Sequence, residues 1–133
     1  MTGWQRDLED GAADADDRDA LPTSAQVEVA AETFRMLSSS TRLLIVRILV
    51  DAEHDVTSLA ELADASVQAV SQHLAKLRLA GHVGSRREGR RVIYTVDDPH
   101  VVTMVEEIFE HIAPDGSLAP DPDERRPQRR SRR

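Results

Sequence analysis

Hydrophobic positions recur at three- and four-residue spacing over most of residues 22–113, the pattern that is typical of amphipathic helices. Small hydroxyl residues, whose side chains satisfy the free N–H groups at helix starts, stand before these segments. The spacing predicts helices that begin near Ser24, near Ser40 or Thr41, near Thr57 or Ser58, and after Ser66. We expect the helix after Ser66 to run to Ala80 and to stop at Gly81, because glycine most readily takes the left-handed conformation that ends a helix.

The rest of this region predicts a β-hairpin and one more helix. Two short runs rich in β-branched residues or arginine flank a turn of three to four residues around Gly89; they are Val83–Arg87 and Val92–Val96. Asp98 followed by Pro99 is typical of an N-cap and first helical position, and opens a helix to about Ile112. The order α-α-α-α-β-β-α is that of a mainly α winged helix-turn-helix with a β-hairpin wing.

The ends of the chain differ from this region in composition. Residues 1–21 are acidic, and residues 114–133 combine four prolines with an arginine cluster, so we expect both segments to be disordered. No apolar run resembles a secretion signal or a membrane span, which predicts a cytoplasmic protein with no membrane partner. Cysteine is absent, which excludes disulfides, thiolate metal sites and cysteine nucleophiles within these 133 residues.

One segment of this acidic chain has an excess of basic residues. The chain carries a net charge of −7, yet residues 72–95 hold six basic side chains against one acidic side chain, a local charge of +5. Four of the basic residues belong to the predicted hairpin: Arg86, Arg87, Arg90 and Arg91. Arginines on a wing can neutralise DNA phosphates beside a groove, so this segment predicts a surface that binds DNA.

The helix after Ser66 carries a polar face that suits the same partner. On a helical wheel its apolar residues share one side; they are Val67, Val70, Leu74 and Leu77, with His73 at the edge. Gln68, Gln72 and Lys76 fall on the opposite side, with Ser71 on its flank. Glutamine can bond base edges in the major groove. An ordinary solvated face explains this helix equally well, and the arginine-rich hairpin downstream favours DNA.

Several of these stretches together resemble the ArsR/SmtB family of bacterial winged-helix repressors. They are Phe34–Arg42, Leu59–Ala63, Val70–Leu77, Ala80–Val83 and Gly89–Tyr94. The resemblance implies a homodimer, joined through its first and last helices, that binds an inverted-repeat operator in double-stranded DNA. It also implies that Gln68, Ser71 and Gln72 contact bases, and that Arg42 supports the fold rather than touching bases.

Two histidines on the last predicted helix point to a metal. His100 and His111 are eleven residues apart, which places them on nearly one face but about 16 Å apart along the axis. One chain therefore cannot offer both to one ion, whereas antiparallel last helices of two subunits would bring His100 of one chain near His111 of the other, with Asp98 beside it. Imidazole and carboxylate ligands suit borderline metals.

The resemblance implies such an interfacial site, binding zinc, cobalt or nickel. The family often has a fourth ligand at the position that is Pro114 here, which cannot ligate; Glu107, one turn before His111, Asp115 or water can substitute. A simpler interpretation of His111 is that a cation suits a helix C-terminus, but this does not explain His100 and Asp98.

Four functions follow from these features. The first is a repressor that a divalent metal releases from its operator. The second is a repressor of the same type that senses no metal, and metal titration with a DNA-binding readout separates the two. The third is a metal-dependent hydrolase using Asp98, His100 and His111; it is disfavoured because no Ser/His or paired-carboxylate arrangement, phosphate-binding loop or substrate-sized domain is recognisable. The fourth is a winged helix that contacts only proteins, against which the basic hairpin argues. The sequence favours the first and predicts no enzyme.

Overall fold

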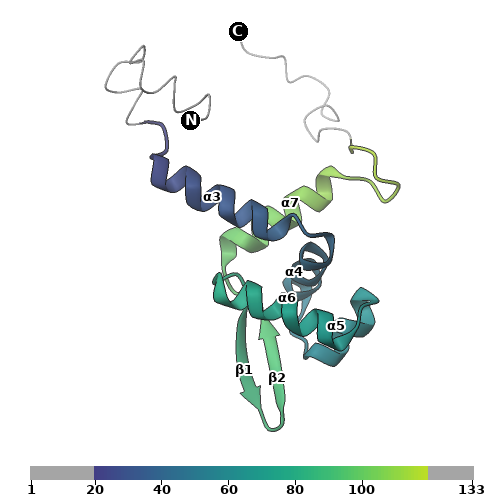
Figure 1. The fold of residues 1–133 in the computed structure, drawn as a ribbon. Coiled ribbons are helices and arrows are strands. Elements are labelled where there is room, and N and C mark those ends of the chain that lie inside the picture. Colours follow the sequence, from purple (N-terminus) through teal and green to yellow (C-terminus); the bar gives the residue numbers. More distant parts are fainter. Residues whose placement is uncertain (1–19, 120–133) are drawn as a thin grey trace. The chain divides into compact units, whose positions relative to one another are not determined.

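The computed structural model describes residues 20–119, so most of the two predicted disordered segments lies outside it. The chain divides into two units at Ser39 and Ser40. The first unit contains α3 (Ser24–Leu37). The second contains α4 (Ser40–Asp51), α5 (Val56–Ala63), α6 (Val67–Leu79), β1 (Gly84–Glu88), β2 (Arg91–Thr95) and α7 (Pro99–His111), as Figure 1 shows. Within the described residues this is the predicted order, α-α-α-α-β-β-α.

Helix α3 begins with a different cap from the one predicted. The hydroxyl of Thr23, not that of Ser24, accepts a hydrogen bond from the N–H of Gln26 at 3.1 Å. The side-chain oxygen of Gln26 in turn accepts from the N–H of Thr23 at 2.7 Å. This reciprocal pair satisfies two free N–H groups at once, which explains why the cap moves one residue upstream.

The starts of α4 and α5 also differ from the prediction. Ser40 and Thr41 both lie inside α4 rather than capping it. Helix α5 begins at Val56, and its N-cap is Asp55, whose carboxylate accepts from the N–H of Ser58 at 2.9 Å. Thr57 and Ser58 were wrong as candidates because a carboxylate two or three residues earlier takes the capping position, where aspartate is as well suited as serine.

Helix α6 begins and ends as predicted. The hydroxyl of Ser66 accepts from the N–H of Ala69 at 3.0 Å. Gly81 has a positive φ of 83°, and its N–H donates to the carbonyl of Arg78 while the N–H of His82 donates to the carbonyl of Leu77. This pair of bonds closes the C-terminus in the manner that glycine permits, and the chain then enters the hairpin.

The second unit is built around α4, which contacts α5, α6, α7 and β2. The residues that are buried between positions 40 and 119 are all aliphatic: Ile45, Val46, Leu49, Leu59, Ala60, Val70, Leu74, Leu77, Val83, Ile93, Val96, Val101 and Val105. Figure 1 shows the hairpin projecting from one end of the unit and α7 lying at the other. The hairpin and α7 are therefore separate surfaces. Helix α4 contacts both β2 and α7, and residues 96–98 link β2 to α7 along the chain.

Two further features concern the ends of the fold. The chain continues beyond residue 113 in a hydrogen-bonded turn, in which the N–H of Ala119 donates to the carbonyl of His111 at 2.7 Å and Ile112 pairs with Leu118. Between residues 20 and 119, no helix is both long and apolar enough to cross a bilayer.

Candidate functional site

The polar face of α6 that is predicted to contact DNA bases, here called the reading face, is exposed. Gln68, Ser71, Gln72 and Lys76 all face solvent, whereas Val70, Leu74 and Leu77 are fully buried. One expectation was wrong: Val67, placed with the apolar residues, is 48% exposed, because it is the first residue of the helix and lies beyond the edge of the core. Among residues 40–119, the polar face of α6 is thus an uncovered surface.

His73 lies at the edge of this helix, as the wheel predicts. It is half-buried, and its Nδ1 lies 3.5 Å from a guanidinium nitrogen of Arg42 on α4. Partial burial lowers the pKa of His73, and the nearby positive charges of Arg42 and Lys76 lower it further. These surroundings disfavour the charged form of His73, and its side chain links α6 to α4.

The hairpin is tighter than predicted. Its loop has two residues, Gly89 and Arg90, because Glu88 still pairs with Arg91 across the strands. A φ of 65° at Gly89, the first loop residue, permits this tight turn. The pairing also places Arg86 opposite Ile93 and Arg87 opposite Val92. Because side chains alternate between faces, Arg86 and Arg87 point to opposite faces of the wing.

The four wing arginines have different surroundings. Arg86 forms ion pairs with Glu53 and, at 3.2 Å, with Glu88, and these contacts raise the pKa of Arg86. The Nε of Arg91 donates to the carboxylate of Asp55 at 2.9 Å. For Arg87 and Arg90, no ion-pair partner occurs among residues 20–119, and both are exposed.

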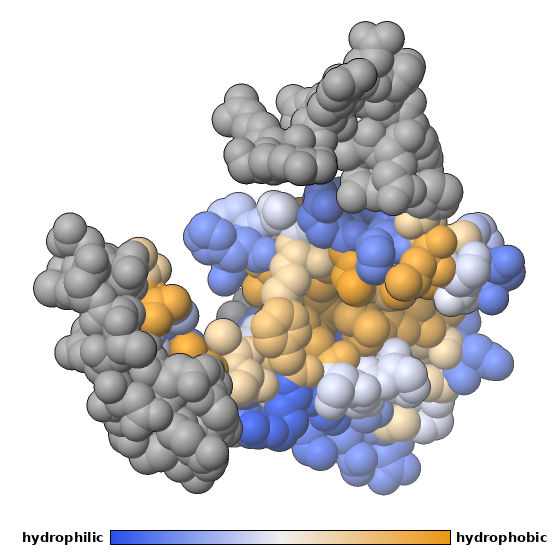
Figure 2. Space-filling model, turned by 90° about the horizontal axis from the view of Figure 1, so that it is seen from above, coloured by the Kyte–Doolittle hydropathy of each residue, from blue (hydrophilic) through white to orange (hydrophobic). Residues whose placement is uncertain are grey.

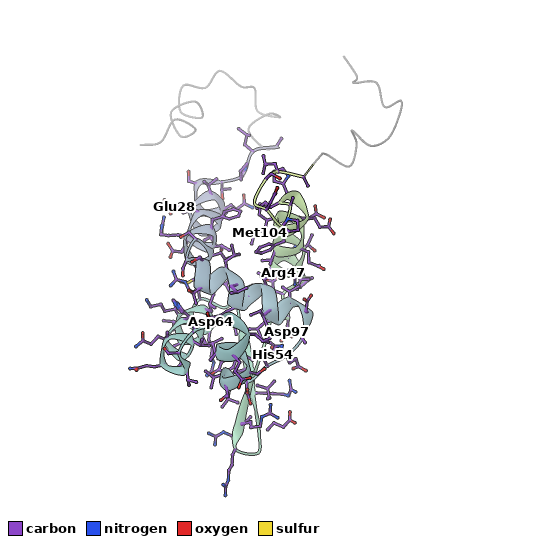
Figure 3. All side chains as sticks on the ribbon, turned by 90° about the vertical axis from the view of Figure 1, so that its right-hand side faces the viewer. Glu28, Arg47, His54, Asp64, Asp97 and Met104 are labelled. Atoms are coloured by element: carbon purple, nitrogen blue, oxygen red, sulfur yellow. The ribbon has the colours of Figure 1, made fainter. Side chains whose placement is uncertain are left out.

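Sequence reasoning missed the segment that holds the wing. The connection between α4 and α5 runs beside β2, where the N–H of Tyr94 donates to the carbonyl of His54 at 2.8 Å. His54, on this connection, is half-buried, and its Nδ1 lies 2.9 Å from the hydroxyl of Ser58; Figure 3 shows it where helices and hairpin meet. The carboxylate of Asp55 accepts from both Ser58 and Arg91, and these two hydrogen bonds lower its pKa, that from Ser58 most strongly.

The predicted metal ligands all lie on α7 or at its start, and all are exposed. Asp98 caps the helix: one carboxylate oxygen accepts from the N–H of His100 at 2.8 Å. His100 is in the first turn, and Glu107 and His111 lie on nearly the same face further along. Within residues 20–119 of one chain, no three His, Cys, Asp or Glu side chains are grouped closely enough to hold a metal.

Helix α7 also exposes apolar surface. It buries only Val101 and Val105, while Ile108, Phe109 and the adjoining Ile112 are 36–42% exposed. Phe109 lies beneath the guanidinium of Arg47, 6.0 Å from the ring centre. Figure 2 shows that apolar side chains are exposed on the face of the molecule seen from above. This stripe borders the face that carries His100 and His111.

Comparison with known proteins identifies the fold's family. Residues 39–84 match the model of bacterial regulatory proteins of the arsR family. The chain is 41% identical over 99 residues to the HTH-type transcriptional regulator KmtR of Mycobacterium tuberculosis, which covers 72% of this chain and 75% of KmtR. The chain belongs to the arsR family. This ArsR-family chain is also 37% identical over 82 residues to a CadC homologue of Staphylococcus aureus, a cadmium resistance transcriptional regulatory protein, covering 61% of this chain and 68% of that one.

The chain is also similar to the solved structure of HlyU from Vibrio cholerae. That structure shares 32% identity and a TM-score of 0.62 with the ArsR-family chain, covering 65% of this chain and 94% of HlyU. The chain is thus a DNA-binding transcriptional regulator with a winged helix-turn-helix fold, not an enzyme. The family resemblance seen in the sequence and its predicted fold are confirmed.

Proposed function

We propose that this ArsR-family chain is a homodimeric repressor that binds an inverted-repeat operator in double-stranded DNA and loses affinity for it when a divalent transition metal binds between the α7 helices of the two protomers. The metal is zinc, cobalt or nickel. The observation that carries the proposal is the arrangement on α7, where His100 and His111 are exposed on one face beside an apolar stripe. The protein acts in the cytoplasm.

DNA reading is assigned to α6 and the wing. The exposed Gln68, Ser71 and Gln72 form a compact uncharged face, and glutamine can bond adenine through two hydrogen bonds. Lys76 lies at the edge of this face and the wing arginines follow it along the chain, so both can contact phosphates on either side of the groove. A dimer would present two such faces, which is what an inverted repeat requires.

Dimerisation is supported by the exposed stripe of α7. Ile108, Phe109 and the adjoining Ile112 lie on one side of α7 and are 36–42% exposed, so one chain leaves this apolar stripe partly uncovered. Apolar stripes of this kind on small domains are typical of interfaces between copies. An antiparallel pairing of two α7 helices would cover the stripe and would bring the start of one helix near the end of the other.

The metal proposal depends on the side chains that such a pairing brings together. Asp98 and His100 of one protomer, with His111 and Glu107 of its partner, offer two imidazoles and two carboxylates, a donor set that suits zinc, cobalt or nickel. One carboxylate oxygen of Asp98 serves as the helix cap, and the other has no hydrogen-bond partner among residues 20–119. Because the 133 residues contain no cysteine, the thiolate ligands that softer metals prefer are absent. A bound metal would supply a cross-link between the two helices.

Regulation by metal is also supported by one relative. The CadC homologue from Staphylococcus aureus is described as a cadmium resistance regulatory protein, so control linked to a metal occurs among similar chains. In this chain, Asp98 and His100 directly follow the wing strand β2. A cross-link at this point can change the spacing between the α6 helices of the two protomers. An inverted repeat tolerates little change in that spacing.

The test is to select a preferred duplex from a random pool and to measure its affinity by fluorescence anisotropy, without metal and with Zn²⁺, Co²⁺ or Ni²⁺. We expect at least one metal to weaken binding by about 5- to 150-fold, the usual range for coupling between two sites. Tight metal-independent binding would contradict metal sensing and favour the repressor that senses no metal. Absence of any preferred duplex would contradict operator binding itself.

A further inference from the structure

We propose that the wing divides its four arginines between two roles, with Glu53 and Asp55 holding Arg86 and Arg91 as positioning residues that fasten the wing, while Arg87 and Arg90 make its phosphate contacts. This inference rests on the proposed DNA-binding function and deepens it. The sequence alone gives all four arginines the same role, because it does not show which of them face a carboxylate.

The first observation is the environment of Arg86. Its guanidinium is paired with two carboxylates from different parts of the chain, Glu53 on the α4–α5 connection and Glu88 on its own strand. All three side chains are about half exposed, so the pairs are not protected by burial. Two negative charges on one guanidinium leave this point of the wing with a net negative charge, which repels phosphate.

The second observation is the double use of Asp55. One of its carboxylate oxygens caps α5 by accepting from Ser58, and the other accepts from the Nε of Arg91 on β2. A single side chain thus ties the first helix of the helix-turn-helix to the wing strand. The backbone bonds between His54 and Tyr94, at 2.8 and 3.3 Å, lie beside this contact and fix the same strand. Arg91 is therefore occupied in setting the position of the wing.

The third observation is the face on which each arginine lies. Arg86, Glu88 and Arg91 share the face that carries the buried Ile93, which is turned toward the α4–α5 connection. Arg87 lies on the opposite face, and Arg90 lies in the two-residue turn at the tip. Both are exposed, and no carboxylate pairs with them in the part of the chain that the structure describes. Within residues 20–119, no carboxylate offsets the charge of these two arginines, so both can contact phosphates.

The experiment compares four variants with the same change in charge: Arg86→Gln, Arg87→Gln, Arg90→Gln and Arg91→Gln. Affinity for a mixed-sequence duplex of about 30 base pairs is measured from about 50 to 200 mM salt. Each lost phosphate contact lowers the slope of log affinity against log salt by about 0.9, so the affinity loss over this range shrinks about 3.5-fold. We expect this change in the Arg87 and Arg90 variants and the wild-type slope in the Arg86 and Arg91 variants.

A second variant frees Arg86 to contact phosphate, and it tests whether the carboxylates keep Arg86 from DNA. Glu53→Gln with Glu88→Gln removes both partners of Arg86 and leaves the Asp55 cap intact. We expect the slope to steepen by about 0.9, and Arg86→Gln added to this pair should abolish the increase. Glu106→Gln with Glu110→Gln is the matched control, because both carboxylates are exposed on α7, away from the wing, and it should keep the wild-type slope.

The outcomes separate this inference from the proposed function. If the wild type binds the duplex and all four arginine variants lower the slope equally, the division of roles is wrong and DNA binding stands. An unchanged slope in the Glu53 and Glu88 double variant would also overturn the division. If the wild type binds no duplex even at the lowest salt concentration, the proposed function fails and this inference fails with it.

Discussion

Helices α6 and α7 are both 13 residues long, but they differ in what one chain does with them. Helix α6 buries Val70, Leu74 and Leu77 completely and exposes mainly polar side chains on its opposite face. Helix α7 buries only Val101 and Val105. Its remaining surface carries exposed apolar residues, two histidines and several carboxylates.

The difference indicates which surface is complete in one chain and which surface would need a second copy to cover it. The face of α6 that is proposed to contact DNA needs no second chain, because Val70, Leu74 and Leu77 are fully buried within one chain and the polar side chains opposite them are exposed. The surface of α7 presents an apolar stripe and metal-type ligands that one chain leaves exposed, and a second copy would use both. This contrast predicts that changes on the polar face of α6 alter DNA recognition alone, whereas changes on α7 alter assembly and metal response.

The largest effect is expected from Ile108→Glu on α7. If the stripe is the dimer contact, an unpaired carboxylate placed in it costs about 3 kcal/mol or more, which raises the dimer dissociation constant at least about 100-fold. Sedimentation equilibrium at micromolar concentration should show a dimer for the wild type and a 14.8 kDa monomer for the variant.

Thr103→Glu is the matched control for this prediction. It adds the same charge to the same helix, but Thr103 is exposed on the side away from the buried Val101 and Val105. This variant should remain dimeric. Equal dissociation by both variants, or a monomeric wild type, would contradict the assignment of the stripe.

The next effect is expected from His111→Ala. His111 lies at the far end of α7 from the wing strand, so operator affinity without metal should stay close to wild type. The metal-dependent weakening, about 5- to 150-fold in the wild type, should disappear. Anisotropy titrations with and without Zn²⁺, Co²⁺ and Ni²⁺ measure both quantities, and a full metal response in the variant would place the metal elsewhere.

On α6, Gln72→Ala should change recognition and leave metal response intact. Losing a two-bond contact to a base reduces discrimination between the preferred duplex and its base-substituted versions by about 10-fold, within the 1–3 kcal/mol typical of such contacts. Dimerisation should be unaffected. Unchanged preference at every base position would remove Gln72 from the reading face.

The smallest effect concerns pH and His73. Its pKa is lowered in the folded protein, so near and below pH 6.5 the unfolded chain binds more protons than the folded chain. The free energy of unfolding should therefore decline as pH falls from about 6.5 through the folded pKa. Urea unfolding should show a shallower decline for His73→Gln than for the wild type; a steeper one would reverse the assigned direction.

Local patterns explain what the sequence could predict. The helix of α6, its cap at Ser66 and its end at Gly81 follow from short-range spacing, as does the Asp98–Pro99 start of α7. Positions of single caps were less predictable, because Thr23 and Asp55 compete with neighbouring hydroxyls and the winner depends on which N–H each can reach.

The fastening of the wing was beyond local reasoning. Glu53 and Asp55 are 33 and 36 residues from Arg86 and Arg91, their ion-pair partners, so nothing in the spacing links them. The only signal was the presence of two acidic residues in a loop of a fold that also has an arginine-rich hairpin. The exposure of the α7 stripe was equally beyond sequence, since helical periodicity marks a face as apolar without showing what covers it.

The most direct test of the contrast between α6 and α7 is metal binding by mixed dimers of His100→Ala and His111→Ala chains, co-refolded in equal amounts. Each variant alone should bind no Co²⁺, whereas a mixed dimer retains one intact pair, His100 from one chain and His111 from the other. With random pairing we expect about one quarter of the wild-type Co²⁺ stoichiometry. A mixture that binds no Co²⁺ while the wild type does would contradict a site shared between the two α7 helices.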